Sequence, residues 1–140
     1  MIPIPEPARA LLTSGQLAHV VTTNADGSAQ ISLVWVGVDG DEIVLAHMGH
    51  GQKIRNLRRD PRVSLSMEGT ATEPSGLKQY LVVHGTARIT DGGAPELLQE
   101  LAHVYLGPDV VFPNFPDPPP GVIVHIAVDR LAGPGPWNEG

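Results

Sequence analysis

Positive charge in this chain is concentrated in one short segment that follows a turn. The protein has 9 Lys and Arg residues against 15 Asp and Glu, which gives a formal net charge of −6. More than half of these cations lie in the segment 53–62, namely Lys53, Arg55, Arg58, Arg59 and Arg62. The segment follows the turn-forming sequence Gly49-His50-Gly51-Gln52. Free backbone N–H groups and the helix dipole attract anions at the start of a helix, so the pattern predicts a site for a small anionic ligand.

Length and composition exclude several classes of protein. A chain of 140 residues is expected to form one domain. It contains no Cys, which excludes disulfides, thiol nucleophiles and zinc–thiolate sites. An acidic chain with a single basic segment lacks the broad basic face that nucleic acids bind, so nucleic acid is not expected as a partner. No apolar run approaches the ~20 residues that span a bilayer, and the N-terminal residues do not form a secretory signal. We therefore expect no membrane association and a cytoplasmic location.

Short strands joined by tight turns dominate the first part of the hydrophobic pattern. A brief helix is predicted over 8–13, followed by strands over 17–23, 28–38 and 42–47. The turns between these strands have hairpin sequences, so the three strands are expected to form an antiparallel meander. In the second of them, alternation places Gln30, Ser32 and Val34 on one face of the strand and Leu33 and Trp35 on the other.

The basic segment and the second half of the chain complete a small barrel. A helix is predicted over 52–59, ended by Asp60-Pro61. Strands are expected over 62–68, 77–90 and 122–128, with a bulge at Gly85. An amphipathic helix is predicted over 94–106, and it precedes a proline-rich loop over 112–121. The pattern predicts one mainly β (α+β) domain over 1–140, a six-stranded antiparallel barrel with two or three short helices.

Two segments resemble a known family. The sequence Lys-Ile-Arg-Asn-Leu-Arg-Arg-Asp-Pro-Arg-Val-Ser-Leu at 53–65, followed by Leu-Val-Val-His-Gly-Thr-Ala at 81–87, resembles the split-barrel flavoproteins related to pyridoxamine 5′-phosphate oxidase. The likeness is closest to the actinobacterial branch that binds the deazaflavin coenzyme F420, and it covers the chain from Leu17 to about Leu131. It implies a split β-barrel and a homodimer with the cofactor site at the two-fold interface.

The resemblance also implies which residues bind the cofactor. Lys53 would hold the cofactor phosphate, with Gln52 beside it. The strand residues Gln30, Ser32, Leu33, Val34 and Trp35 would line the flat ring, partly through their backbone groups. Ala46 and His47 match a cofactor contact on the third strand, and Tyr80 falls where the oxidases place a polar contact. No residue is assigned a catalytic role, and no metal site is expected, because His47 and His50 are accompanied by no carboxylate in sequence.

Two departures from the family pattern bear on the activity. The oxidases usually carry Arg just before the lysine, where this chain has Gln52, so one phosphate ligand must come from elsewhere. They also carry a C-terminal Arg-x-His substrate motif, whereas this chain has Asp129-Arg130-Leu131-Ala132-Gly133. Oxidation of pyridoxamine phosphate is therefore not expected.

Three functions remain open at this point. The first is an oxidoreductase that uses reduced coenzyme F420 to transfer hydride to an activated unsaturated small molecule. The alternatives are an FMN-dependent reductase or oxidase on the same fold, and a non-catalytic carrier of the cofactor.

Four side chains also have more than one possible place. Arg55 and Arg59 either face solvent or contact the oligoglutamate tail of coenzyme F420. Trp35 belongs either to the barrel core or to the wall of the ring pocket. Trp137 is either disordered or folded over the ring.

Overall fold

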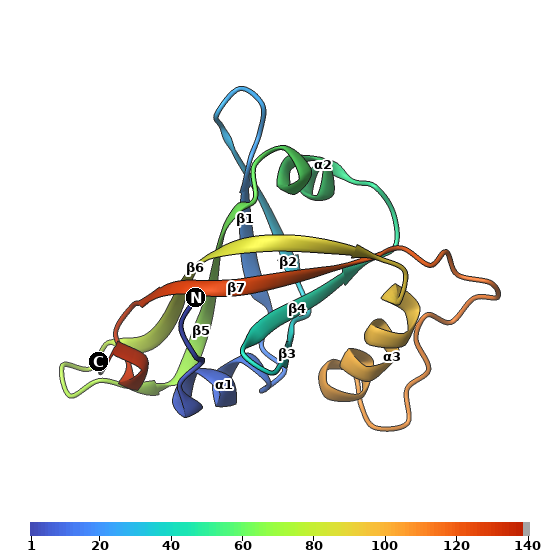
Figure 1. The fold of residues 1–140 in the computed structure, drawn as a ribbon. Coiled ribbons are helices and arrows are strands. Elements are labelled where there is room, and N and C mark those ends of the chain that lie inside the picture. The colour runs from blue at the N-terminus through green and yellow to red at the C-terminus, as the bar shows by residue number, and fades with distance from the viewer. Residues whose placement is uncertain (139–140) are drawn as a thin grey trace.

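The computed structural model describes residues 1–138, which form one antiparallel sheet flanked by short helices (Figure 1). The helices are α1 (Glu6–Leu12), α2 (Gln52–Arg59) and α3 (Ala94–Tyr105), and a 3-10 turn, η1 (Pro136–Asn138), follows the last strand. The strands are β1 (Ala18–Thr23), β2 (Ala29–Val34), β3 (Gly37–Asp39), β4 (Glu42–His47), β5 (Arg62–Thr72), β6 (Lys78–Asp91) and β7 (Val122–Ala132). The prediction of a mainly β, split-barrel domain is confirmed. No helix among the described residues is both long and apolar enough to cross a bilayer.

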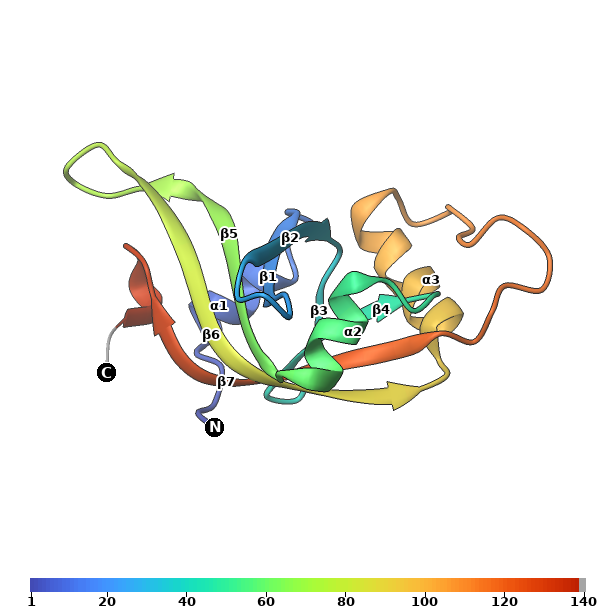
Figure 2. The ribbon, with the colours of Figure 1, turned by 90° about the horizontal axis from the view of Figure 1, so that it is seen from above.

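The sheet has two free edges although it is strongly curved (Figure 2). Its strand order is β2-β1-β5-β6-β7-β4-β3, so the two edge strands, β2 and β3, follow each other in the chain. Trp35 and Val36 join them. The single strand predicted over 28–38 is therefore wrong, and the described residues form seven strands rather than six. The first part of the segment 28–38 pairs with β1 and its last part pairs with β4. The alternation of side chains along the segment does not reveal this change of partner.

Tyr105 holds the junction between the two edges. The Val36 N–H donates a hydrogen bond to the Tyr105 hydroxyl at 3.0 Å, and this hydroxyl donates to the Gln16 carbonyl at 2.8 Å. Trp35 stacks on Tyr105 with ring centroids 5.4 Å apart and also packs against Phe112 at 5.2 Å. Trp35 therefore lies against α3 and outside the buried cluster of the barrel core. The last residue of α3 binds both the entry to β1 and the link from β2 to β3.

The core lies on the concave face of the sheet, because every second residue of the long strands points inward. Val20, Leu65 and Ile126 are examples of such buried side chains. At Gly85 the register between β6 and β7 shifts, which confirms the predicted bulge. A Cβ atom at Gly85 would lie only 2.5 Å from the Ala127 carbonyl oxygen, so this close approach requires glycine.

The C-terminal segment packs at the lower end of the barrel, against α1 (Figure 1). Trp137 is only 6% exposed and belongs to the hydrophobic core, with its indole N–H donating to the Gly133 carbonyl at 3.2 Å. Both earlier alternatives for Trp137, disorder and a place over a ring, are therefore wrong. Its role in the described structure is to bury apolar surface between η1 and α1.

Candidate functional site

Helix α2 is fastened to the end of β1 by a buried asparagine. Asn56 has no exposed surface, and its side-chain Nδ2 donates to Thr22 Oγ1 at 3.0 Å and to Asn24 Oδ1 at 2.8 Å. Ile54 and Leu57 bury the apolar stripe of the helix beside it. Sequence reasoning missed this role of Asn56, although a polar residue within an apolar stripe is a usable signal. These contacts fix the position of the helix start.

The ammonium group of Lys53 lies under this helix, next to β2. Lys53 is only 6% exposed, and its Nζ lies 3.5 Å from Ser32 Oγ. No carboxylate within residues 1–138 forms a salt bridge with it. Burial lowers the pKa of Lys53, because desolvation disfavours the charged form. A buried cation without a counter-charge is costly, so an anion beside it would be strongly stabilising.

The turn before α2 adds backbone donors at the same place. The Gly51 N–H donates to His47 Nε2 at 3.3 Å, and the N–H groups of Ile54 and Arg55 both donate to the Gly51 carbonyl. In the part of the chain that the structure describes, the N–H groups of Gln52 and Lys53 have no acceptor. Two free donors and one ammonium group therefore surround the start of α2, which is the composition of an anion site.

His47 is held neutral by its surroundings. Burial lowers the pKa of His47, and the nearby positive charges of Lys53 and His50 lower it further. Its Nε2 accepts the Gly51 hydrogen bond only in the unprotonated form, so the neutral imidazole and the turn support each other.

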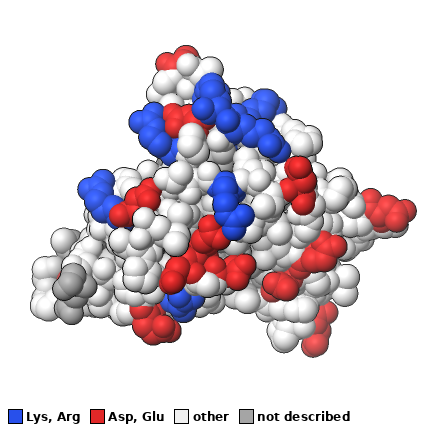
Figure 3. Space-filling view, viewed as in Figure 1, with Lys and Arg blue, Asp and Glu red and all other residues white. Residues whose placement is uncertain are grey.

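The arginines of the basic segment take different directions. Arg55 folds back over the first turn of α2, where Nη1 donates to the His50 carbonyl and Nη2 to Gln52 Oε1, both at 2.7 Å. Arg59 donates to the Thr23 carbonyl, and Arg58 and Arg62 form ion pairs with Asp91 and Asp60. Figure 3 shows the resulting gathering of cationic side chains over α2. Only Arg55 brings a guanidinium group back to the helix start.

The structure separates the predicted residues of β2 onto two faces. Gln30, Ser32 and Val34 are half-buried on the inner side, and Gln30 Oε1 accepts a hydrogen bond from Thr22 at 3.0 Å. Leu33 lies on the outer side and is 58% exposed. Because β2 pairs only with β1, half of its backbone N–H and C=O groups point away from the sheet and remain open to a ligand.

The other predicted residues lie at different distances from Lys53. Ala46 and His47 end β4, directly before the turn, and are half-buried. Gln52 is exposed and its Nε2 donates to Asn56 Oδ1 at 2.7 Å, so its side chain lies along the helix. Tyr80 lies on the outer face of β6, in a separate pocket of about 540 Å³ with His19 and Ser66. One protomer therefore does not bring Tyr80 to Lys53.

The remaining histidines form no metal centre in the described part of the chain. Among residues 1–138, no group of three or more His, Cys, Asp or Glu side chains is placed to hold a metal ion.

Comparison with known proteins agrees with this geometry. A family model described as pyridoxamine 5′-phosphate oxidase matches residues 4–133. The chain belongs to this family. The region matched to the pyridoxamine 5′-phosphate oxidase family includes α2, β2 and β4, and so all residues of the candidate site. No curated protein matches the chain.

Solved structures of similar fold are named for different cofactors. An F420 reductase has a TM-score of 0.74 and 26% identity, with 92% of this chain and 98% of that chain covered. A conserved hypothetical protein from Mycobacterium tuberculosis has a TM-score of 0.70 and 26% identity, with 94% and 85% covered. An FMN-binding protein from Syntrophomonas wolfei subsp. wolfei has a TM-score of 0.67 at 16% identity, with 93% and 85% covered, and shows the likeness of the fold alone.

Proposed function

We propose that this chain is an oxidoreductase that binds reduced coenzyme F420 and transfers its hydride to an activated unsaturated small molecule. The observation that carries the proposal is the buried side chain of Lys53, which has no counter-charge among the described residues and belongs to a helix whose first two N–H groups have no acceptor there. The similarity to an F420 reductase over nearly the full length of both chains supports the choice of cofactor.

The residues at the start of α2 fit a phosphate group. Lys53 Nζ and the N–H groups of Gln52 and Lys53 would bind its oxygens. Arg55 would supply the second cation, because its guanidinium group reaches the same turn and keeps further N–H donors free. In this way Arg55 would replace the arginine that the related oxidases carry at the position of Gln52.

The bound cofactor supplies the hydride, and the chain supplies binding and orientation. The unpaired backbone groups of β2 would orient the ring by hydrogen bonds, with Ser32 and Val34 beneath it on the inner face. His47 and Ala46 would form the opposite end of the site. The half-buried His47 and the buried Lys53 stem would keep water from the reacting face.

A two-fold homodimer is part of the proposal. Ile31 and Leu33 expose 62% and 58% of their surface on the outer face of β2, which is unusual for adjacent large apolar residues on one strand. A second protomer on this face would cover them. It would also bring a partner copy of Tyr80 toward the site that one protomer leaves incomplete. Sedimentation velocity of the full chain would reveal the dimer, and Leu33→Glu would dissociate it.

FMN is the second candidate cofactor, because its phosphate suits the same donors and one protein of the same fold binds it. The two candidates are separated by measuring the equilibrium dissociation constant of each with the full chain. We expect tighter binding of coenzyme F420, because the basic surface over α2 complements its oligoglutamate tail. Tighter binding of FMN would reverse the assignment.

The site itself is tested by Lys53→Ala, with Arg9→Ala on α1, at the other end of the barrel, as the control for loss of a cation. Loss of a charged hydrogen bond at position 53 should weaken binding of the true cofactor by about 1.5–3 kcal/mol. The control substitution should leave the affinity unchanged. Unchanged affinity for both cofactors in Lys53→Ala would show that the phosphate lies elsewhere. Stopped-flow oxidation of bound reduced coenzyme F420 by quinones or enones then distinguishes an enzyme from a carrier, which binds without turnover.

A further inference from the structure

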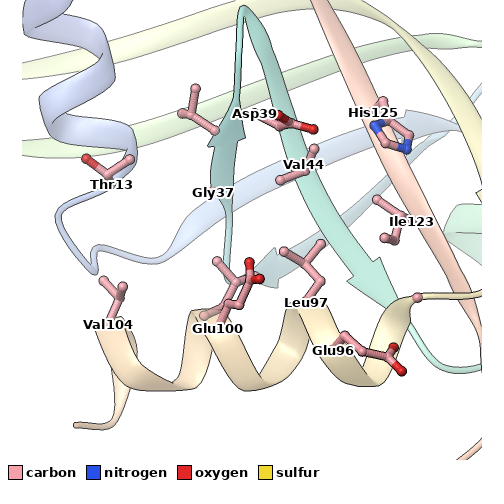
Figure 4. A pocket seen from close by; sticks show the side chains of 13 residues that line it. Thr13, Gly37, Asp39, Val44, Glu96, Leu97, Glu100, Val104, Ile123 and His125 are labelled. Carbon is pink, nitrogen blue, oxygen red and sulfur yellow. The ribbon is translucent and has the colours of Figure 1, made fainter. Parts of the chain in front are cut away.

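A second pocket lies on the opposite side of β4 from the core, beneath α3. Its volume is about 640 Å³, within the range of small-molecule sites. Residues of β3, β4 and β7 form one wall and α3 forms the other, with Thr13 and Val104 at one end (Figure 4). None of the residues predicted to bind the cofactor lines it. We call this cavity the α3 pocket.

The floor of the α3 pocket is apolar. Val44 from β4 and Ile123 from β7 face Leu97 from α3 (Figure 4), and Leu101 also lines the cavity. These side chains come from the facing surfaces of a helix and a sheet, and part of their apolar surface lines the cavity. Such a surface suits an aliphatic or aromatic body of ligand size.

The rim of the pocket carries negative charge only. Asp39 comes from β3, and Glu96 and Glu100 come from α3. Within residues 1–138 these three carboxylates have no hydrogen bond and no salt bridge, and the lining contains no Lys or Arg. Arg88 lies outside the lining and forms its ion pair with Glu42 at 2.7 Å, although its charge also acts on Asp39.

His125 provides an independent polar feature in the same wall. It stands opposite Val44 across the strand pair, and its Nε2 lies 2.9 Å from Thr90 Oγ1. Its Nδ1 is buried and, among the described residues, has no hydrogen-bond partner; Glu42 Oε1 is 3.9 Å away. Burial, followed by the charge of Arg88, lowers the pKa of His125, and the carboxylates of Glu42 and Asp39 act in the opposite direction. Unpaired buried polar atoms are rare in folded proteins and need a reason.

We propose that the α3 pocket binds a small organic cation with an apolar body, such as an alkyl or aryl amine. The ammonium group would lie between the carboxylates of Asp39 and Glu100, and the apolar body would cover Val44, Leu97 and Ile123. An anionic ligand such as the cofactor phosphate is repelled by the same rim. The pocket and the anion site at α2 therefore select ligands of opposite charge.

The probe for this proposal is dansylcadaverine, a primary amine on an aromatic body whose fluorescence reports burial. Two matched probes carry the same dye: its N-acetyl derivative is neutral, and dansyl-6-aminohexanoate is anionic. We expect saturable binding of the amine to the full chain, at least about fivefold weaker binding of the neutral probe, and weaker binding still of the anion. The affinity of the amine should fall as ionic strength rises.

Variants locate the binding site. The double substitution Asp39→Asn, Glu100→Gln removes two exposed carboxylates with little change of shape. It should lower the affinity for the amine probe by about tenfold. The control Glu6→Gln removes an exposed carboxylate outside the pocket and should leave the affinity unchanged. Amide NMR shifts on binding should appear at Leu97, Ile123 and His125, and saturating FMN should not compete.

Several outcomes would overturn the proposal. Equal affinity for the amine and the neutral probe would show that charge does not select the ligand. The same conclusion follows if the double variant binds like the wild type. Shifts confined to the turn before α2, or competition by FMN, would assign the probe to the anion site instead.

Discussion

Lys53 Nζ lies 3.5 Å from Ser32 Oγ, and this hydroxyl is the single polar side chain within hydrogen-bond distance of it in residues 1–138. The pair joins the start of α2 to the inner face of β2. A neutral hydroxyl replaces little of the hydration that the ammonium group loses, so the free protein holds this charge at a cost. The cost is measurable without knowledge of the ligand.

Replacing Lys53 with Met should raise the free energy of unfolding. The thioether chain keeps the apolar stem and removes the unpaired charge, so we expect a gain of about 1 kcal/mol or more at pH 7. The folded-state pKa of Lys53 lies below its unfolded value, and the folded wild type therefore becomes more stable as pH rises toward 10.5. The advantage of Lys53→Met should shrink over the same range. Urea unfolding at several pH values measures both effects, and a loss of stability on substitution would mean that the ammonium group is compensated.

The imidazole of His47 should titrate below its ordinary pKa of 6.5 in the free protein. Because its folded-state pKa is lowered, the unfolded chain binds the proton more readily, and stability falls as pH drops below 6.5. An anion at the start of α2 should raise the pKa of His47 by offsetting the charges of Lys53 and His50. NMR titration of the His47 imidazole with and without phosphate measures this shift. An unchanged His47 titration would place the anion elsewhere.

Substitution of Tyr105 with Phe should weaken the junction between the sheet edges. It keeps the stacking on Trp35 but removes the hydroxyl that joins Val36 and Gln16, so we expect a loss of about 1–2 kcal/mol. Tyr80→Phe is the matched control, because the Tyr80 side chain is 47% exposed and should change stability by less than about 0.5 kcal/mol. Equal effects of the two substitutions would contradict the role given to Tyr105.

Trp137→Ala should destabilise the fold without affecting cofactor affinity. The indole is 6% exposed in the core beside α1, and removing a buried Trp side chain costs about 3–5 kcal/mol. Thermal unfolding measures the loss, and cofactor titration at low temperature measures affinity. A lower affinity for the cofactor in a fully folded variant would mean that Trp137 contributes to the binding site.

Local signals in the sequence identified several elements correctly. The bounds of α2 and of β4 agree with prediction, because turn residues, an Asp-Pro stop and regular spacing mark their ends. The bulge at Gly85 was predictable because glycine within a strand has few other uses. The anion site at the start of α2, predicted from the concentration of cations after a glycine turn, stays a prediction.

Contacts between distant residues were beyond the sequence pattern. Lys53 is buried beside Ser32, which lies far from it in the sequence, on a strand that pairs with β1. The Tyr105 hydroxyl meets Val36, 69 positions away, and no local pattern indicates this pair. The split of 28–38 into two strands depends on which neighbours each half pairs with, and alternation is the same in both cases.

The two edge strands of the sheet, β2 and β3, are joined only through the chain link Trp35–Val36 and not by strand pairing. No ladder of interstrand hydrogen bonds joins β2 to β3, so these edges can separate while every strand pair stays intact. At this link the Tyr105 hydroxyl accepts the Val36 N–H, and the Trp35 ring stacks on Tyr105. Because both contacts come from the last residue of α3, the position of this helix and the spacing of the two free edges depend on each other.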